Sequence, residues 1–155
     1  MNSYELLENE ACEEGINIID YEFKSERIKG LYCDGSIAIN KSLQTTPEKV
    51  SVLAEELGHY YTTAGDILDQ TDTSNRKQER RARLWAYDRL IGLSRIIKSF
   101  EAGCLSRYEI AEFLEISESF LQEALDCYSE KYGQCVVIDG YVVFFTPSLG
   151  IMKKI

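Results

Sequence analysis

The chain has 155 residues, 45% of them hydrophobic and 28% charged, a composition typical of a soluble globular protein with a substantial core. Its formal net charge of −9 argues against a general nucleic-acid-binding protein, because phosphate contacts need clustered Lys and Arg. There is no apolar run of about 18 residues, no signal peptide and no Cys-x-x-Cys pair among the five scattered cysteines. We therefore expect a cytoplasmic protein with reduced thiols, no membrane contact and a protein partner.

The N-terminal third predicts one helix followed by three strands. The helix, Tyr4–Glu14, carries apolar residues at helical spacing and ends before Gly15. The strands are expected at Ile16–Tyr21, Arg27–Cys33 and Ser36–Asn40. Between the last two, Asp34-Gly35 is typical of a type I′ hairpin turn.

The middle of the chain predicts two helices separated by a polar loop at 65–75. The first begins with Thr46 as its N-cap and Pro47 at the first helical position. Its apolar stripe consists of Val50, Leu53, Ala54, Leu57 and Tyr61. The second is a single long helix from about Arg76 to Phe100.

The C-terminal third predicts two helices, Arg107–Leu114 and Ser117–Tyr132, and then a hairpin at Gln134–Phe145 around Asp139-Gly140, followed by a short tail. The whole pattern predicts an α+β fold: a small antiparallel three-stranded sheet with packed helices, a helix-turn-helix-like pair and a C-terminal hairpin. Gly103 is the one seam in the pattern, so we expect a core of residues 1–102 and a subdomain of residues 103–155 packed on it.

The sequence Glu55-Glu56-Leu57-Gly58-His59 is a variant of the zinc-peptidase signature His-Glu-x-x-His, in which two imidazoles bind zinc and the Glu between them is the base. Glu56 and His59 occupy the base and second-ligand positions, and Glu55 replaces the first His. Since His59 is the only histidine, a metal site must combine one imidazole with carboxylates. The alternative is a solvated polar face, which is what most such pairs form.

Glu79 lies 20 positions after His59, the spacing at which a third, carboxylate ligand follows in peptidases with two His and one Glu as ligands. It shares a helical face with Ala82, Ala86, Leu90, Leu93 and Ile97. A carboxylate on such a face needs a partner. A metal shared with His59 would serve, and so would pairing with an arginine or exposure near the start of the helix.

These residues together resemble the ImmA/IrrE family of metallopeptidases. The resemblance includes Gly30-Leu31-Tyr32 with Asp34-Gly35, residues 52–63 around the motif, Asn75–Glu79 leading to Trp85, and Arg107–Leu114. It implies a zincin-like core, similar to gluzincins, and a cytoplasmic zinc-dependent endopeptidase. Such an enzyme cleaves a helix-turn-helix repressor and so acts as the anti-repressor of a phage or mobile element. Position by position, it implies Glu56 as general base and His59 and Glu79 as metal ligands.

The composition of the metal site depends on whether Glu55 is a ligand. If it is a ligand, the Glu-His-Glu site is neutral with a divalent ion, its water is less acidic than usual, and Mn²⁺ or Fe²⁺ competes better with Zn²⁺. If it is not, Asp66 or Asp69 completes the site or the site is degenerate. We favour Glu55 as a ligand.

No histidine remains to stabilise an oxyanion, so a tyrosine hydroxyl from Tyr60, Tyr61 or Tyr87 is expected instead, although each tyrosine also fits a packing role.

The helix-turn-helix-like pair carries acidic residues in its second helix (Glu118, Glu123 and Asp126), which argues against direct DNA binding and favours packing or substrate docking. The one basic cluster, Arg76, Lys77, Arg80, Arg81 and Arg83, fits a solvated face or an anchor for an acidic segment. The apolar run Val142–Phe145 predicts a buried hairpin, or an edge that accepts a substrate strand. The alternatives to a peptidase are an inactive relative that binds the repressor and, third, a DNA-binding regulator.

Overall fold

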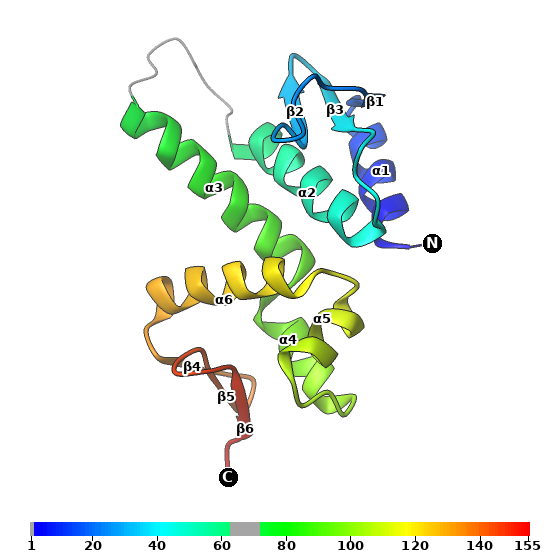
Figure 1. The fold of residues 1–155 in the computed structure, drawn as a ribbon. Helices are drawn as coiled ribbons and strands as arrows, with labels where there is room; N and C mark the ends of the chain where they lie inside the picture. Colours follow the sequence, from blue (N-terminus) through cyan, green and yellow to red (C-terminus); the bar gives the residue numbers. More distant parts are fainter. Residues whose placement is uncertain (1, 63–71) are drawn as a thin grey trace. The chain divides into compact units, whose positions relative to one another are not determined.

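The computed structural model describes residues 2–62 and 72–155 and divides the chain into two compact units, residues 1–86 and 87–155. The predicted α+β fold is confirmed (Figure 1). The helices described are α1 (Ser3–Glu13), α2 (Thr46–Thr62), α3 (Asp72–Leu90), α4 (Gly92–Glu101), α5 (Arg107–Leu114) and α6 (Glu118–Tyr132). The strands described are β1 (Asn17–Tyr21), β2 (Gly30–Cys33), β3 (Ser36–Asn40), β4 (Cys135–Ile138), β5 (Tyr141–Phe144) and β6 (Gly150–Lys153). The predicted division into a peptidase core of residues 1–102 and a C-terminal subdomain of residues 103–155 stays a prediction.

The sheet of the first unit has the order β1-β3-β2 and is mixed, so the expectation of a purely antiparallel sheet was wrong. β2 pairs antiparallel with β3 across the predicted turn, where Asp34 and Gly35 both have positive φ, 44° and 79°. β1 pairs parallel with β3, because the chain reverses twice between them, once before β2 and once after it.

Helices α1 and α2 lie against this sheet (Figure 1). α1 begins with a capping box, in which the side chains of Asn2 and Glu5 each accept the other residue's backbone N–H. α2 begins one residue earlier than predicted: Thr45, not Thr46, accepts the N–H of Glu48, at 3.3 Å, as the cap.

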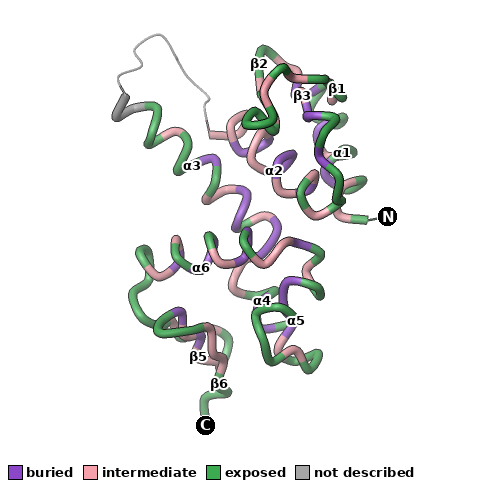
Figure 2. Tube along the Cα trace, viewed as in Figure 1, coloured by how far each residue is buried: buried purple, intermediate pink, exposed green. Residues whose placement is uncertain are grey.

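The core of the first unit lies between the sheet and the two helices, where Figure 2 shows buried segments facing inward. The predicted stripe of α2 is confirmed for its four aliphatic residues, Val50, Leu53, Ala54 and Leu57, each at most 1% exposed. From β3, Ile37 and Ile39 complete this core.

The predicted long helix at 76–100 is wrong, because it is two helices, α3 and α4. The break lies at Ile91, with φ −114° and ψ −81°, and at Gly92, with φ +62°. Glycine adopts this left-handed conformation without the steric cost that a Cβ adds, so α3 ends just before it.

In the second unit, α5 and α6 form the predicted helical pair, capped by Ser106 and Ser117. The hairpin β4-β5 turns at Asp139 and Gly140, again with positive φ at both residues. The predicted tail instead forms β6, antiparallel to β5. Along the residues that the structure describes, no helix combines the length and apolar character needed to cross a membrane.

Candidate functional site

The two helices that carry the predicted site touch backbone to backbone. A Cβ added at Gly58 of α2 would lie 2.3 Å from the carbonyl oxygen of Ala82 in α3. No side chain larger than hydrogen fits there, so glycine is what permits this crossing. The crossing brings together His59 of α2 and Glu79 of α3, which are 20 positions apart in sequence.

His59 and Glu79 meet beside this crossing, with 3.1 Å between His59 Nε2 and Glu79 Oε1. The side chain of His59 is 20% exposed and that of Glu79 is 53% exposed. Glu79 was expected at the head of a buried stripe. It is exposed because the stripe becomes buried only one turn later, at Ala82 and Ala86.

The donor set of His59 and Glu79 fits a divalent metal. Two ligand atoms bonded to one tetrahedral zinc ion at about 2.0–2.2 Å are about 3.3–3.6 Å apart, close to the observed distance. The same 3.1 Å also suits a hydrogen bond from the imidazole to the carboxylate. Only a small movement of the two side chains is therefore needed to change the hydrogen-bonded pair into a pair of metal ligands.

Glu56 follows Glu55 in the motif, three positions before His59. It is only partly exposed, and its pKa is raised to about 7. Burial is the main cause, and the negative charges of Glu55 and Glu79 add to it. The backbone N–H of Tyr32 in β2 favours the charged form of Glu56 and so opposes the shift. A carboxyl group with a pKa near neutrality can both take up and release a proton at pH 7.

Glu55 lies close enough to raise the pKa of Glu56. Within residues 2–62 and 72–155, however, no three His, Cys, Asp or Glu side chains form a group that could hold a metal ion. The structure thus joins His59 and Glu79, while the ligand role of Glu55 stays a prediction. Asp66 and Asp69 lie outside the described residues.

Comparison with known protein families identifies the family to which this chain belongs. The model of the peptidase M78 family, described as the IrrE N-terminal-like domain, matches residues 11–126, more than half of the chain. The chain belongs to this family. Family members are generally metal-dependent. The comparison with curated proteins gave no match.

The M78 match confirms the predicted family and supports a peptidase. It includes the EExxH segment, Glu79 and α5, and it ends within α6, at Asp126. The replacement of the first His by Glu55 and the link to phage are not part of what the match establishes.

The three candidate oxyanion tyrosines of this M78 domain all donate to glutamates. Tyr60 donates at 2.9 Å to Glu14, the C-cap of α1, and Tyr61 donates at 3.3 Å to Glu10 within α1. Burial of Tyr61 and the nearby glutamates raise its pKa to about 12. Tyr87 is buried in the second unit and donates to Glu123, at 3.5 Å. An oxyanion role for any of them stays a prediction.

An aromatic cluster beside the motif was not anticipated from sequence. Tyr32, Tyr60 and Tyr61 form successive edge-to-face ring contacts, with centroids 5.9 and 4.9 Å apart. Tyr61 then stacks on Trp85 of α3, at 4.9 Å and 24°. Helical spacing placed Tyr61 on the apolar stripe of its helix and indicated no partner for Trp85.

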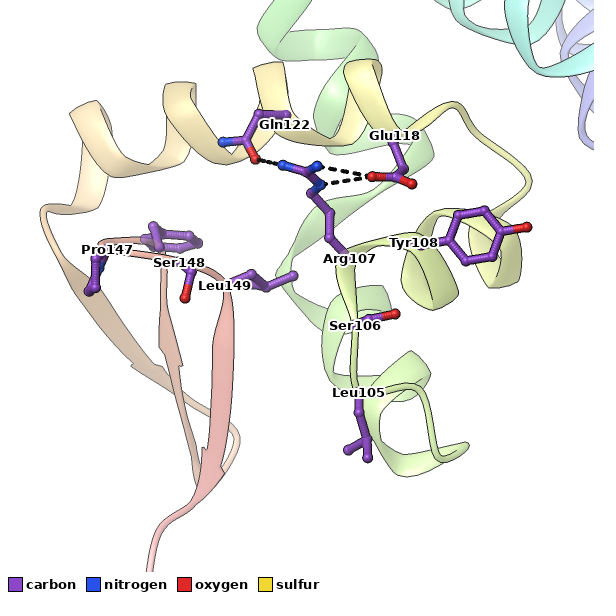
Figure 3. Close-up of a pocket in the computed structure, with 10 residues that line it drawn as sticks. Leu105, Ser106, Arg107, Tyr108, Glu118, Gln122, Pro147, Ser148 and Leu149 are labelled. Carbon is purple, nitrogen blue, oxygen red and sulfur yellow. Dashed lines mark hydrogen bonds and ion pairs between the residues drawn. The ribbon is translucent and has the colours of Figure 1, made fainter.

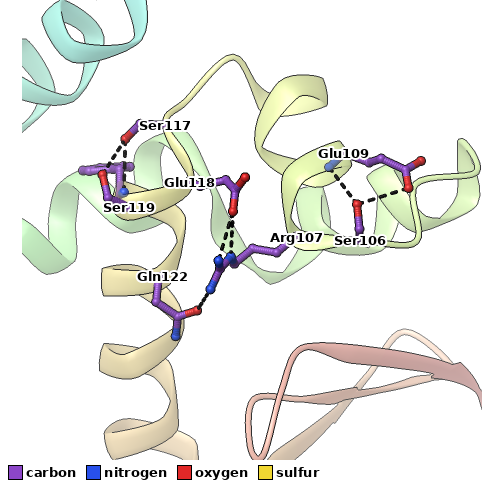
Figure 4. Close-up of polar contacts among 8 residues, drawn as sticks. Ser106, Arg107, Glu109, Ser117, Glu118, Ser119 and Gln122 are labelled. Carbon is purple, nitrogen blue, oxygen red and sulfur yellow. Dashed lines mark hydrogen bonds and ion pairs between the residues drawn. The ribbon is translucent and has the colours of Figure 1, made fainter.

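The second compact unit, residues 87–155, contains a pocket of about 460 Å³ that includes none of the predicted site residues (Figure 3). Arg107 lies on its wall and binds Glu118 and Gln122 of α6 (Figure 4). Glu118, one of the acidic residues expected in the second helix of the pair, therefore links α6 to α5 through Arg107. The basic residues of α3, from Arg76 to Arg83, are exposed, as a solvated face requires.

Proposed function

We propose that the chain is a metal-dependent endopeptidase that acts in the cytoplasm on a helix-turn-helix repressor and so relieves repression of a phage or mobile element. The observation that carries the proposal is the pairing of His59 with Glu79 at 3.1 Å next to Glu56. In a member of the M78 family, these three positions hold the residues that hydrolysis of a peptide needs.

In the proposed mechanism, His59, Glu79 and Glu55 hold a divalent ion, Zn²⁺ or else Mn²⁺ or Fe²⁺. When bound, the ion supplies a Lewis acid for the scissile carbonyl and for the attacking water. Glu56 takes the proton from that water and then transfers it to the leaving amine. Burial of Glu56 suits both steps, because its pKa of about 7 makes proton uptake and release comparably easy at neutral pH.

The neighbouring residues prepare these groups. Gly58 lets α3 approach so that Glu79 reaches His59. In the metal-free protein, burial and then the like charges of Glu55 and Glu79 raise the pKa of Glu56. The same concentration of carboxylates attracts a cation, which would relieve their mutual repulsion.

The first test is elemental analysis of protein purified without chelators. About one metal ion per chain is expected in the wild type and in Glu13→Ala, which removes an exposed carboxylate of α1. His59→Ala and Glu79→Ala should lose it. Loss in Glu55→Ala would assign Glu55 as a ligand, and retention would point to another ligand.

The second test is cleavage of the purified repressor encoded beside the gene for this chain. Glu56→Gln should keep its metal and lower the cleavage rate by about 10²–10⁴-fold, the usual contribution of a general base. A wild type that takes up none of the three ions would refute the peptidase. A protein that binds the repressor without cutting it would then be the better account.

A further inference from the structure

The strand β2 has one side paired and one side turned toward α2. The sheet order β1-β3-β2 leaves β2 at the edge. Asn40 donates its N–H to the carbonyl of Lys29 at 2.8 Å, and Leu31 and Cys33 stand opposite Ala38 and Ser36. Because bonding alternates along an antiparallel strand, the backbone groups of Leu31 and Cys33 face β3 and those of Gly30 and Tyr32 face outward.

The outward side of β2 meets Glu56. The outward-facing N–H of Tyr32 lies near enough to the Glu56 carboxylate to lower its pKa. A Cβ at Gly30 would lie 3.2 Å from Cγ of Glu56 and 2.6 Å from Cγ1 of Val52, one helical turn earlier. Gly30 does not have the positive φ that would favour glycine, so its value here is the space that it leaves for α2.

We propose that Gly30 and the backbone N–H of Tyr32 are positioning elements that hold the Glu56 carboxylate in its working orientation. This rests on the proposed function of Glu56 as general base. A glutamate side chain has three rotatable bonds and loses much of its activity as a base when it points the wrong way. The N–H fixes one carboxylate oxygen by a charge-assisted bond, which leaves the other oxygen for the attacking water.

The competing account is that Gly30 only allows the sheet to pack against Val52. Under that account, any change that restores packing restores activity. Under ours, the two distances at Gly30 have separate effects: the contact with Val52 governs stability and the contact with Glu56 governs the rate.

The first experiment separates the N–H of Tyr32 from its side chain. Tyr32→Ala removes the ring and keeps the N–H, whereas Tyr32→Pro removes both, at an outward position of an edge strand where proline is tolerated. With a library of fluorescence-quenched peptides as substrate, we expect kcat of the Pro variant to be about 10–100-fold below that of the Ala variant. KM and metal content should be the same in both. Equal kcat values would overturn the proposal.

The second experiment uses Gly30→Ala, Val52→Ala and the double variant. Val52→Ala makes room for the new Cβ, so the double variant should recover the thermal stability that Gly30→Ala loses. Its kcat should stay about tenfold below that of Val52→Ala, because the contact with Glu56 Cγ persists. Full recovery of kcat in the double variant would support the packing account and overturn ours.

A third measurement does not depend on cleavage. Amide hydrogen exchange should show Tyr32 N–H protected in the metal-free wild type and at least tenfold less protected in Glu56→Ala. Leu31 and Cys33, which face β3, should be unchanged. An unchanged Tyr32 would overturn the proposal. If the wild type cleaves no peptide, the proposed function fails, and exchange alone decides whether Tyr32 holds Glu56.

Discussion

Carboxylates are used in opposite ways in the two compact units. In residues 1–86, Glu55, Glu56 and Glu79 gather near a single histidine, and burial together with their mutual repulsion raises the pKa of Glu56. In residues 87–155, Glu118 lies 3.0 Å from the Arg107 guanidinium, and Asp88 accepts the Tyr128 hydroxyl at 2.9 Å. The first arrangement costs stability and provides reactivity, and the second joins elements of the fold. Neutralising one carboxylate should therefore have opposite effects in the two units.

The largest effect on stability should come from Gly58→Ala in the first unit. The new Cβ meets the Ala82 carbonyl oxygen, which is backbone and cannot rotate away. We expect a loss of about 3 kcal/mol in the free energy of unfolding, at the upper end for overpacking, together with loss of bound metal. Urea denaturation and metal analysis measure both.

The matched control for that prediction is Gly150→Ala in the second unit. Its Cβ would lie 4.0 Å from the nearest atom, Cβ of Phe144, so the change should stay within about 0.5 kcal/mol. Equal stability of the two variants would show that the α2–α3 crossing is looser than the backbone contact implies.

The second effect is a gain in stability from Glu56→Gln in metal-free protein. The pKa of Glu56 is about 7 in the folded protein and 4.5 for the free side chain, so its favourable contribution is present below pH 4.5 and is lost as the pH rises through 7. Glutamine has no such dependence. Denaturation in EDTA should show the variant more stable by about 3 kcal/mol at pH 8 and by under about 1 kcal/mol at pH 5. The same gain at both pH values would contradict the raised pKa of Glu56.

The third effect is a loss of stability from Tyr128→Phe in the second unit. Tyr128 is 1% exposed, and the variant leaves Asp88 without this hydroxyl donor. We expect a loss of about 1 kcal/mol. Burial raises the pKa of Tyr128 far above neutrality, so the loss should be equal at pH 5 and pH 8. A loss that changes over this range would mean that another group titrates with this bond.

The smallest effect should come from Arg107→Ala. The side chains of Arg107 and Glu118 are 46% and 40% exposed, and solvent screens such pairs strongly. We expect a change of under about 1 kcal/mol that shrinks further in 0.5 M salt, measured by thermal unfolding. A loss as large as that of Tyr128→Phe would show that the guanidinium closes the α5–α6 pair more firmly than an exposed ion pair does.

Local sequence signals predicted most of the elements. Both Asp-Gly turns were recognised because only a few residue types adopt positive φ at two successive positions. The bounds of α5 were predicted as observed, and α6 begins one residue after its predicted start because Ser117 is its cap. The break at Gly92 was missed because the apolar pattern continues across it. β6 was missed because a four-residue strand shows its pattern only when a partner such as β5 is known.

The site was predictable to the extent that side-chain spacing reveals it. The 20-residue interval between His59 and Glu79 pointed to their meeting, whereas the exposure of Glu79 depends on where the packing of α3 begins. The link from Tyr32 to Glu56 could not be predicted, because a backbone N–H is the same in every residue but proline. The partners of Tyr60 and Tyr61 likewise depend on how α1 packs against α2.

The stacking of Trp85 on Tyr61 gives the protein a fluorescent reporter of its own. Trp85 is the only tryptophan in the chain, so all indole emission comes from this one position between α2 and α3. It lies on the same helix as Glu79 and contacts the residue two positions after His59. Any event that shifts α3 against α2 should alter that emission. We expect the proposed metal binding at His59 and Glu79 to change this emission, so that it can be measured without a dye, a label or a substrate.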